Sequence, residues 1–142
     1  MNICSFKYSH MKKTFLLLLI ALASCTNSLN KNVENAMQQY NNYILHVDAK
    51  GIAGMFTTDG ELAGPNGLTI RGRDSIESFL NQFKDFKVEE QKSTTDSIRR
   101  FGDTAFQYGK YYQRAVVYIT IAEVHVMFQA NWVIQTDGKL LL

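Results

Sequence analysis

The spacing of apolar residues changes near Lys87, and this change limits what the chain can fold into. Before that point apolar residues recur every three or four positions, which is typical of one face of a helix. After it they alternate with polar residues, most strictly over residues 124–134, as along a strand with one buried face. Helices followed by antiparallel strands predict an α+β domain with the helices on one face of a curved sheet.

Two helices are predicted before the first turn. Asp48 is suited to cap the second of them, a short helix that ends before the turn pair Asp59-Gly60. The apolar face of the first helix is formed by Val33, Met37, Tyr40, Ile44 and Val47.

A small hairpin and a third helix are expected next. Residues 61–63 and 68–71 have the pattern of short strands joined by turn residues 64–67. Asp74 stands at an N-cap position with Glu77 three residues later, so we expect a capping box at the start of a helix that reaches residue 83.

Three longer strands are expected in the second half, at residues 88–98, 104–118 and 124–134. The first of these is polar and irregular, which indicates a solvated strand. A turn at Asp137-Gly138 leads into a final short strand at residues 139–142.

The N-terminus carries a separate pattern. Lys12 and Lys13 precede an apolar run at residues 15–21, and Leu-Ala-Ser-Cys follows at residues 22–25. A basic head, a short apolar segment and a small-residue exit are typical of a secretory signal peptide, and the run is shorter than the roughly 20 residues that span a bilayer. The tetrapeptide resembles the lipobox of bacterial lipoproteins, which implies that Cys25 is the acylated first residue of the mature protein.

Three parts are therefore expected: a lipoprotein-type signal peptide at residues 1–24, a polar tether at residues 25–32 and one domain at residues 33–142. This division predicts a lipid-anchored location in the bacterial cell envelope, outside the cytoplasm. Two alternatives stay open, a simple secreted protein in which the cysteine is incidental and a buried N-terminal helix.

Charge and cysteine content exclude several classes of protein. Of the 15 Lys and Arg residues, Lys7, Lys12 and Lys13 lie in the predicted leader, so the rest of the chain nearly balances its 13 Asp and Glu residues. A nucleic-acid binder needs a clustered basic face, and none is indicated. Because Cys4 lies in the leader and Cys25 is assigned to lipid, no disulfide is predicted. No metal site and no cofactor are predicted, since no histidine–carboxylate spacing of a metal site is present.

Several motifs occur in the order and spacing of a known fold. They are Tyr40 in the first helix and residues 53–62, 70–76, 132–134 and 138–139. Together they resemble the nuclear-transport-factor-2-like superfamily, and more narrowly its SnoaL-like and ketosteroid-isomerase-like branches. The resemblance implies a cone-shaped, curved mixed β-sheet wrapped around three N-terminal helices, an apolar cavity at the open end, and often a homodimer through the outer face of the sheet.

The resemblance also implies where catalytic groups would stand. In the steroid-isomerase branch a tyrosine on the first helix and a protonated acid on a late strand hold the oxyanion, while a carboxylate in the first hairpin moves the proton. Tyr40 matches the tyrosine, but the position matching the base is Gly64, and the position matching the second donor is about Ala130. Steroid isomerisation by that chemistry is therefore not expected, and the balance favours a protein that is not an enzyme.

Four residues remain candidates for other catalysis: Tyr40, Asp59, Lys110 and His125. Asp59 with Glu61 would give a carboxylate pair for acid–base work, although an aspartate beside glycine is also an ordinary turn residue. His125 suits a general base, a metal ligand or a pH switch, but it lies on the polar face of its strand, which favours solvent or a second subunit.

The register of the family places the row that contains Lys110 and Arg114 toward the cavity, where these cations would meet an anionic ligand group. The alternative is that the strand bulges near Gly109 and turns them outward. The predicted lining of the cavity is Tyr40, Tyr43, Leu62, Tyr108, Tyr112, Phe128 and Trp132.

Three functions follow as hypotheses. The first is a lipid-anchored envelope protein that binds a small apolar or amphipathic ligand in the cone cavity. The second is a SnoaL-like isomerase, lyase or hydrolase acting on a small hydrophobic substrate. The third is a dimeric protein-interaction module that uses the outer sheet face. The predicted partners are thus a membrane, a small molecule and a second copy of the chain, and no nucleic acid.

Overall fold

The computed structural model describes residues 11–64 and 66–142, with side chains from residue 28 onward. The chain divides into two units at the boundary between Lys31 and Asn32, and each is described by itself. Residues 1–10 of the predicted leader lie outside the described residues, and so does the side chain of Cys25, the predicted acylation site.

The first helix is longer than the sequence pattern predicted. Helix α1 (Met11–Leu45) begins in the first unit and ends in the second, so residues 25–32, predicted as a tether, are helical. Within the described part of the chain, no helix combines the length and the apolar character needed to cross a membrane.

Helix α2 (Ala49–Gly54) is capped as predicted. The Asp48 carboxylate accepts a hydrogen bond from the Gly51 backbone N–H at 2.8 Å, which satisfies one of the free N–H groups of the first turn. Ile52 and Ala53 of this helix are buried against Phe56 and against Ile76 of the third helix. This cluster holds the short helices together at the base of the second unit.

Helix α3 (Arg73–Leu80) begins differently from the prediction. Its N-cap is Gly72, at φ 88°, and neither Asp74 nor Glu77 forms the predicted capping box. The start is fixed instead by Arg73, whose side-chain Nε donates to the Phe56 carbonyl at 3.1 Å and whose backbone N–H donates to the Thr58 carbonyl at 3.3 Å. Asp74 thus lies inside the first turn, where its negative charge interacts favourably with the positive end of the helix dipole.

The strands form two antiparallel sheets rather than one mixed sheet, within the residues described. A hairpin of β1 (Glu61–Ala63) and β2 (Thr69–Arg71) lies between α2 and α3, and the 3-10 turn η1 (Asn81–Phe83) follows α3. The larger sheet has the order β3-β4-β5-β6, formed by β3 (Lys87–Phe101), β4 (Thr104–Val117), β5 (Thr120–Ile134) and β6 (Leu140–Leu141).

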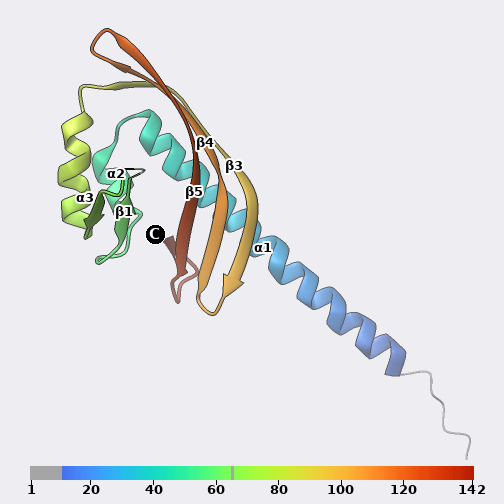
Figure 1. Ribbon diagram of the computed structural model, residues 1–142. Coiled ribbons are helices and arrows are strands. Elements are labelled where there is room, and N and C mark those ends of the chain that lie inside the picture. Colours follow the sequence, from blue (N-terminus) through green and yellow to red (C-terminus); the bar gives the residue numbers. More distant parts are fainter. Residues whose placement is uncertain (1–10, 65) are drawn as a thin grey trace, which may run out of the picture. The chain divides into compact units, whose positions relative to one another are not determined.

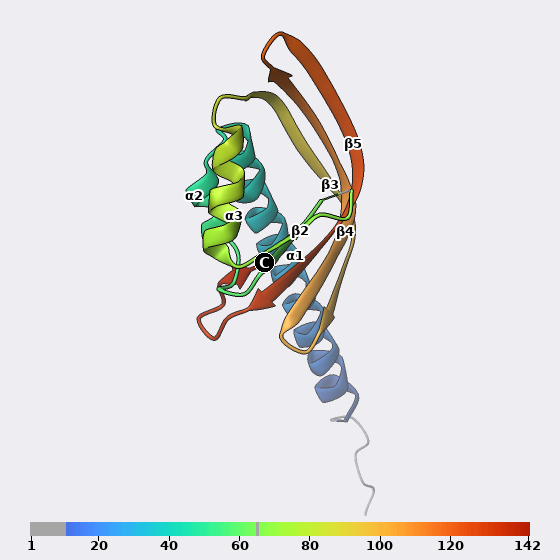
Figure 2. The same ribbon diagram turned by 60° about the vertical axis from the view of Figure 1, so that its left-hand side comes forward.

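The larger sheet bends around the helices of the second unit, as Figures 1 and 2 show. Two register shifts in β3, between Val88 and Glu90 and between Thr95 and Ser97, are the bulges that let an antiparallel sheet curve in this way. The part of α1 within this unit lies on the concave side, because Asn41 is hydrogen-bonded to two residues of β3. The predicted α+β fold, with a curved sheet around N-terminal helices, is confirmed.

A row of hydrogen-bonded side chains, Thr95, Gln107 and Trp132, joins three strands of this sheet. Gln107 is fully buried, and its Oε1 accepts from the Trp132 indole Nε1 at 2.8 Å, while its Nε2 donates to Thr95 Oγ1 at 2.8 Å. Buried amide groups are tolerated when their hydrogen bonds are made, as here. These hydrogen bonds fix which face of β4 points inward, since Ala105 and Gln107 are buried on the same face.

Candidate functional site

A cavity of about 940 Å³ lies between the helices and the concave face of the sheet. This volume falls in the range of roughly 300–1,000 Å³ that is usual for small-molecule sites. Most of its wall is apolar, contributed by α1, by α3 and its following turn, by the hairpin and by the inner rows of β4 and β5. The apolar side chains include Tyr40, Ile44, Leu62, Ile70, Phe79, Phe83, Phe86, Tyr111, Val117, Val124 and Phe128.

Two tyrosines supply phenol groups to the cavity wall. Tyr40 is partly exposed as a residue, but its hydroxyl group lies within the fold. This burial, with a smaller effect of the neighbouring Tyr111, raises the pKa of Tyr40 to about 12. Burial also raises the pKa of Tyr111. Both phenols therefore stay protonated near neutral pH, where they serve as hydrogen-bond donors rather than as bases.

A small polar cluster lies on the same wall. Asn41 Oδ1 accepts hydrogen bonds from Ser93 Oγ at 2.8 Å and from Gln91 Nε2 at 3.2 Å, and all three residues line the cavity. The carbonyl oxygen of the Gln91 side chain is buried without a hydrogen-bond partner among the described residues. The cavity thus offers a few uncharged polar groups on a mainly apolar surface.

Charge is scarce around the cavity. Among the described residues of its lining, Glu61 is the one charged side chain, and it is partnered at 3.6 Å by Arg71. An anionic ligand would find no lysine or arginine to pair with in this lining, and burial of an unpaired charge is costly. The electrostatics therefore favour an uncharged ligand.

The two positions that the resemblance matched to a catalytic base and to a protonated acid both belong to this cavity. Gly64 and Ala130 both line it, and neither has a side chain that can take or give a proton. Tyr40 is present in the same cavity. The structure thus brings together the three positions that the resemblance singled out, with only one of them carrying a functional group.

The predicted lining residues are divided among four places. Tyr40, Leu62 and Phe128 line the cavity, whereas Trp132 is fully buried in the hydrogen-bonded chain with Gln107. Tyr108 and Tyr112 lie on the row of β4 that alternates with the buried row of Gln107, and thus on the outer face of the sheet.

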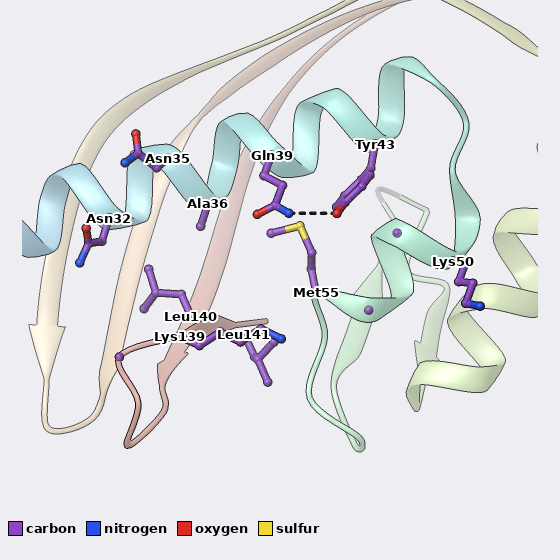
Figure 3. A pocket seen from close by; sticks show the side chains of 13 residues that line it. Asn32, Asn35, Ala36, Gln39, Tyr43, Lys50, Met55, Lys139, Leu140 and Leu141 are labelled. Atoms are coloured by element: carbon purple, nitrogen blue, oxygen red, sulfur yellow. Dashed lines mark hydrogen bonds between the residues drawn. The ribbon is translucent and has the colours of Figure 1, made fainter.

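Tyr43 belongs to a second hollow of about 510 Å³, bounded by α1, by α2 with Met55, and by β6 with the two residues before it (Figure 3). Gln39 Nε2 donates to the Tyr43 hydroxyl at 2.9 Å on the wall of this hollow. Its lining includes Lys50 and Lys139 and is more polar than that of the larger cavity.

Three of the four candidate catalytic residues lie away from the larger cavity. Asp59 is exposed in the turn before β1, and Lys110 and His125 are exposed on the outer sheet face. The His125 ring contacts Tyr112 with ring centroids 4.7 Å apart. These groups do not converge with Tyr40 on one site.

The cation row of β4 follows the outward alternative. Arg114 lies within 3.5 Å of Glu89 and 3.8 Å of Glu123, which belong to the neighbouring strands. The bulge near Gly109 is in the partner strand β3, whereas the pairing of β4 with β5 runs without a shift. The outward direction therefore comes from the phase of the alternation in β4, not from a break in it.

Sequence reasoning missed Tyr111 and the polar cluster of Gln91 and Ser93. A signal for the cluster is present in the sequence, since Gln91, Ser93 and Thr95 form an uncharged row that alternates with Glu90 and Lys92. An uncharged polar row beside a charged one indicates that the first row faces inward. No comparable signal separates Tyr111 from Tyr112.

Comparison with known proteins identifies structures with the same fold but no protein of similar sequence. No protein-family model matches the sequence, and no curated protein matches it either. Solved structures with the same fold include a ketosteroid isomerase-like protein from Erwinia carotovora atroseptica, at 15% identity and a TM-score of 0.69, covering 78% of this chain and 88% of that one.

Two further structures give the same result. ActVI-ORFA from Streptomyces coelicolor is 19% identical with a TM-score of 0.65, over 80% of this chain and 91% of that chain. An NTF2-like protein with a cystatin-like fold from Novosphingobium aromaticivorans is 16% identical with a TM-score of 0.65, over 87% and 85% of the two chains. The predicted nuclear-transport-factor-2-like fold is therefore confirmed, while function must be argued from the site.

Proposed function

We propose that this protein binds a small, uncharged apolar or amphipathic molecule in its larger cavity, and that it does so while anchored through Cys25 to a bacterial envelope membrane. The observation that carries the binding proposal is the cavity itself, which combines an apolar wall with the Asn41 cluster and the protonated Tyr40 phenol. A wall of this kind, with few polar groups, is what small-molecule binding requires.

Binding is favoured over catalysis by the dispersal of the candidate catalytic groups. Asp59, Lys110 and His125 lie outside the cavity, and the positions matched to an acid and a base are Ala130 and Gly64. General acid–base catalysis needs such groups within hydrogen-bond reach of one substrate. Tyr40 alone can orient a ligand by donating a hydrogen bond.

The binding proposal is tested with N-phenyl-1-naphthylamine, a neutral apolar fluorophore, added to the full-length chain. Ala122 lines the cavity, so Ala122→Trp fills part of it and is expected to weaken probe binding about tenfold or more. Met127→Trp adds the same side chain on the exposed outer face of the same strand and should leave binding unchanged.

Two outcomes would contradict the binding proposal. One is a folded Ala122→Trp protein that binds the probe as tightly as the parent. The other is equal or tighter binding of the anionic probe 8-anilinonaphthalene-1-sulfonate by the parent, because the described lining offers no cation to pair with it. If Ala122→Trp does not fold, Phe128→Ala replaces it, since removal of this lining ring should also change the affinity.

Membrane anchoring is tested by fractionation of bacterial cells that produce the full-length chain. Cys25→Ser removes the thiol that the lipobox resemblance assigns to acylation, so the protein is expected to move from the membrane pellet to the soluble fraction. Cys4→Ser is the matched control and should remain in the pellet. Retention of Cys25→Ser in the pellet, or release of Cys4→Ser, would count against the anchor.

A further inference from the structure

A row of aromatic rings runs along one side of the larger cavity. Phe79 and Phe83 meet edge to face with centroids 5.2 Å apart, Phe83 and Phe86 meet at 5.3 Å, and Phe86 reaches Tyr118 at 6.4 Å. The three phenylalanines line the cavity, whereas Tyr118 lies at the turn between β4 and β5. The row thus joins the cavity wall to the tip of a hairpin.

That hairpin tip is apolar and unusually exposed. Tyr118 is 88% exposed, Ile119 98% and Ile121 53%, and the tip extends past the helices of the second unit in Figures 1 and 2. We call these three residues the apolar tip. Every residue from Ala115 to Ala122 is uncharged. Large apolar side chains exposed together usually mark a contact with a protein partner, a ligand or a membrane.

The backbone conformation of the turn is unfavourable for the bulky residues that occupy it. Tyr118 and Ile119 form a two-residue turn between the paired residues Val117 and Thr120, and Tyr118 has φ 56°. Glycine, asparagine or aspartate is the usual residue for a positive φ in such a turn, and a bulky aromatic residue is strained there. The turn therefore keeps an apolar ring at a position where a small or polar residue would be more stable.

The cavity reaches the base of the same hairpin. Val117 and Ala122 line it; Val117 precedes the turn on β4, and Ala122 is the third residue after it on β5. The apolar surface is thus continuous from the interior, along Phe83 and Phe86, to the exposed tip. A ligand that leaves the cavity in this direction meets apolar side chains throughout.

We propose that the apolar tip enters the interfacial layer of a lipid bilayer, and that the cavity exchanges its ligand with the bilayer along the aromatic row. The exchange step rests on the proposed function, whereas insertion of the tip does not. Aromatic and aliphatic side chains on an uncharged segment favour the bilayer interface. A sparingly water-soluble ligand resides mostly in lipid, so the cavity needs contact with that phase.

A bilayer fits this surface better than a protein partner does. A stable protein interface buries about 800 Å² on each side. The apolar tip is one narrow turn with three exposed apolar side chains, and the neighbouring strand residues Arg114 and Glu123 are charged and paired with each other. Insertion into lipid requires only the end of the hairpin.

The opposite turn of the sheet provides a matched control. Phe101, at the turn between β3 and β4, is 83% exposed, but it follows Arg99 and Arg100 and stands two residues before Asp103. Both turns thus expose a large apolar side chain on the same sheet. Only the apolar tip belongs to an uncharged segment and to the aromatic row.

The test places a tryptophan at each turn of the full-length chain, as Ile119→Trp or Phe101→Trp, in phosphatidylcholine vesicles with or without bromine atoms on the acyl chains. Brominated lipid is expected to quench Ile119→Trp at least about twofold more than Phe101→Trp. The buried Trp132 is common to both proteins. Membrane attachment through the N-terminal segment is also common to both proteins.

Three results would overturn insertion of the tip. They are equal quenching at the two turns, quenching at neither turn, and a blue shift of Ile119→Trp emission that depends on protein concentration in the absence of vesicles. The last would assign the apolar tip to contact between copies of the chain.

Ligand exchange is measured separately, with N-phenyl-1-naphthylamine loaded into the brominated vesicles, so that transfer to the protein restores its fluorescence. Ile119→Asp is expected to slow this transfer about tenfold, because a carboxylate at the tip opposes insertion, whereas Phe101→Asp should not. Affinity for the probe without vesicles should stay unchanged in both variants. Equal transfer rates would overturn the exchange step. Quenching at Ile119→Trp without probe binding by the parent would leave the tip proposal supported and the proposed function wrong.

Discussion

Replacing Gly109 by alanine is expected to destabilise the domain by about 3 kcal/mol, the upper end of what overpacking usually costs. A Cβ atom at this position would lie 2.1 Å from the Thr94 carbonyl oxygen and 2.9 Å from the Phe128 ring. The oxygen belongs to the backbone of the adjacent strand, so it cannot move without disturbing the pairing of Thr95 with Gly109. Because Phe128 lines the cavity, ligand binding should weaken as well.

Urea unfolding followed by circular dichroism measures this effect. Gly54→Ala is the matched control, because nothing lies within 4 Å of a Cβ at that position in α2, and the change should be neutral or stabilising by about 0.5–1 kcal/mol. If Gly109→Ala unfolds at the same urea concentration as the parent, the close approach of β3 and β4 is wrong.

Replacing Gln107 by leucine is expected to cost about 2–4 kcal/mol, although leucine has a similar size and is more apolar. The change removes the acceptor of the Trp132 indole N–H and the donor to Thr95 Oγ1, and it leaves the indole N–H buried without a partner. An unpaired buried donor loses its hydration without compensation.

Thermal unfolding with near-ultraviolet circular dichroism reports this loss, since the environment of Trp132 changes with it. Thr95→Val keeps the side-chain shape and leaves Gln107 Nε2 without its acceptor, but the Trp132 indole keeps its partner, so a smaller loss of about 1–2 kcal/mol is expected. Equal stability of Gln107→Leu and the parent would show that the hydrogen bonds of Gln107 do not hold the strands together.

The fold could be predicted from the sequence because its elements agree with their local patterns. The apolar spacing of α1 from Val33 to Ile44, the Asp48 cap and the strict alternation of β5 appear in the structure at the predicted places. Val47, predicted on the same helix face, lies past the end of α1 at φ 52°. The start of α3 could not be predicted, since it depends on the contact of Arg73 with Phe56, which is distant in the sequence. Local capping preferences yield to such a contact.

The cavity was predicted less well, for two physical reasons. In β4 both faces carry aromatic residues, so Tyr111 and Tyr112 are equivalent by composition, and only the burial of Gln107 with Trp132 decides between them. In β3 the bulges interrupt the alternation, which made residues 88–98 look irregular. Val88 and Gln91 both face the cavity although they are three positions apart.

The two bulges of β3 have a consequence for how such a binding site can diversify. Each adds one residue on one side of the ladder, at Glu89 and at Asp96, and each increases the local bend. Gain or loss of a single residue at one of these bulges would alter the curvature of the sheet, and with it the width of the larger cavity, while the side chains that line the cavity stay the same. Ligand size and ligand chemistry are therefore separable traits in this architecture, the first governed by the path of one backbone and the second by the side chains that face inward.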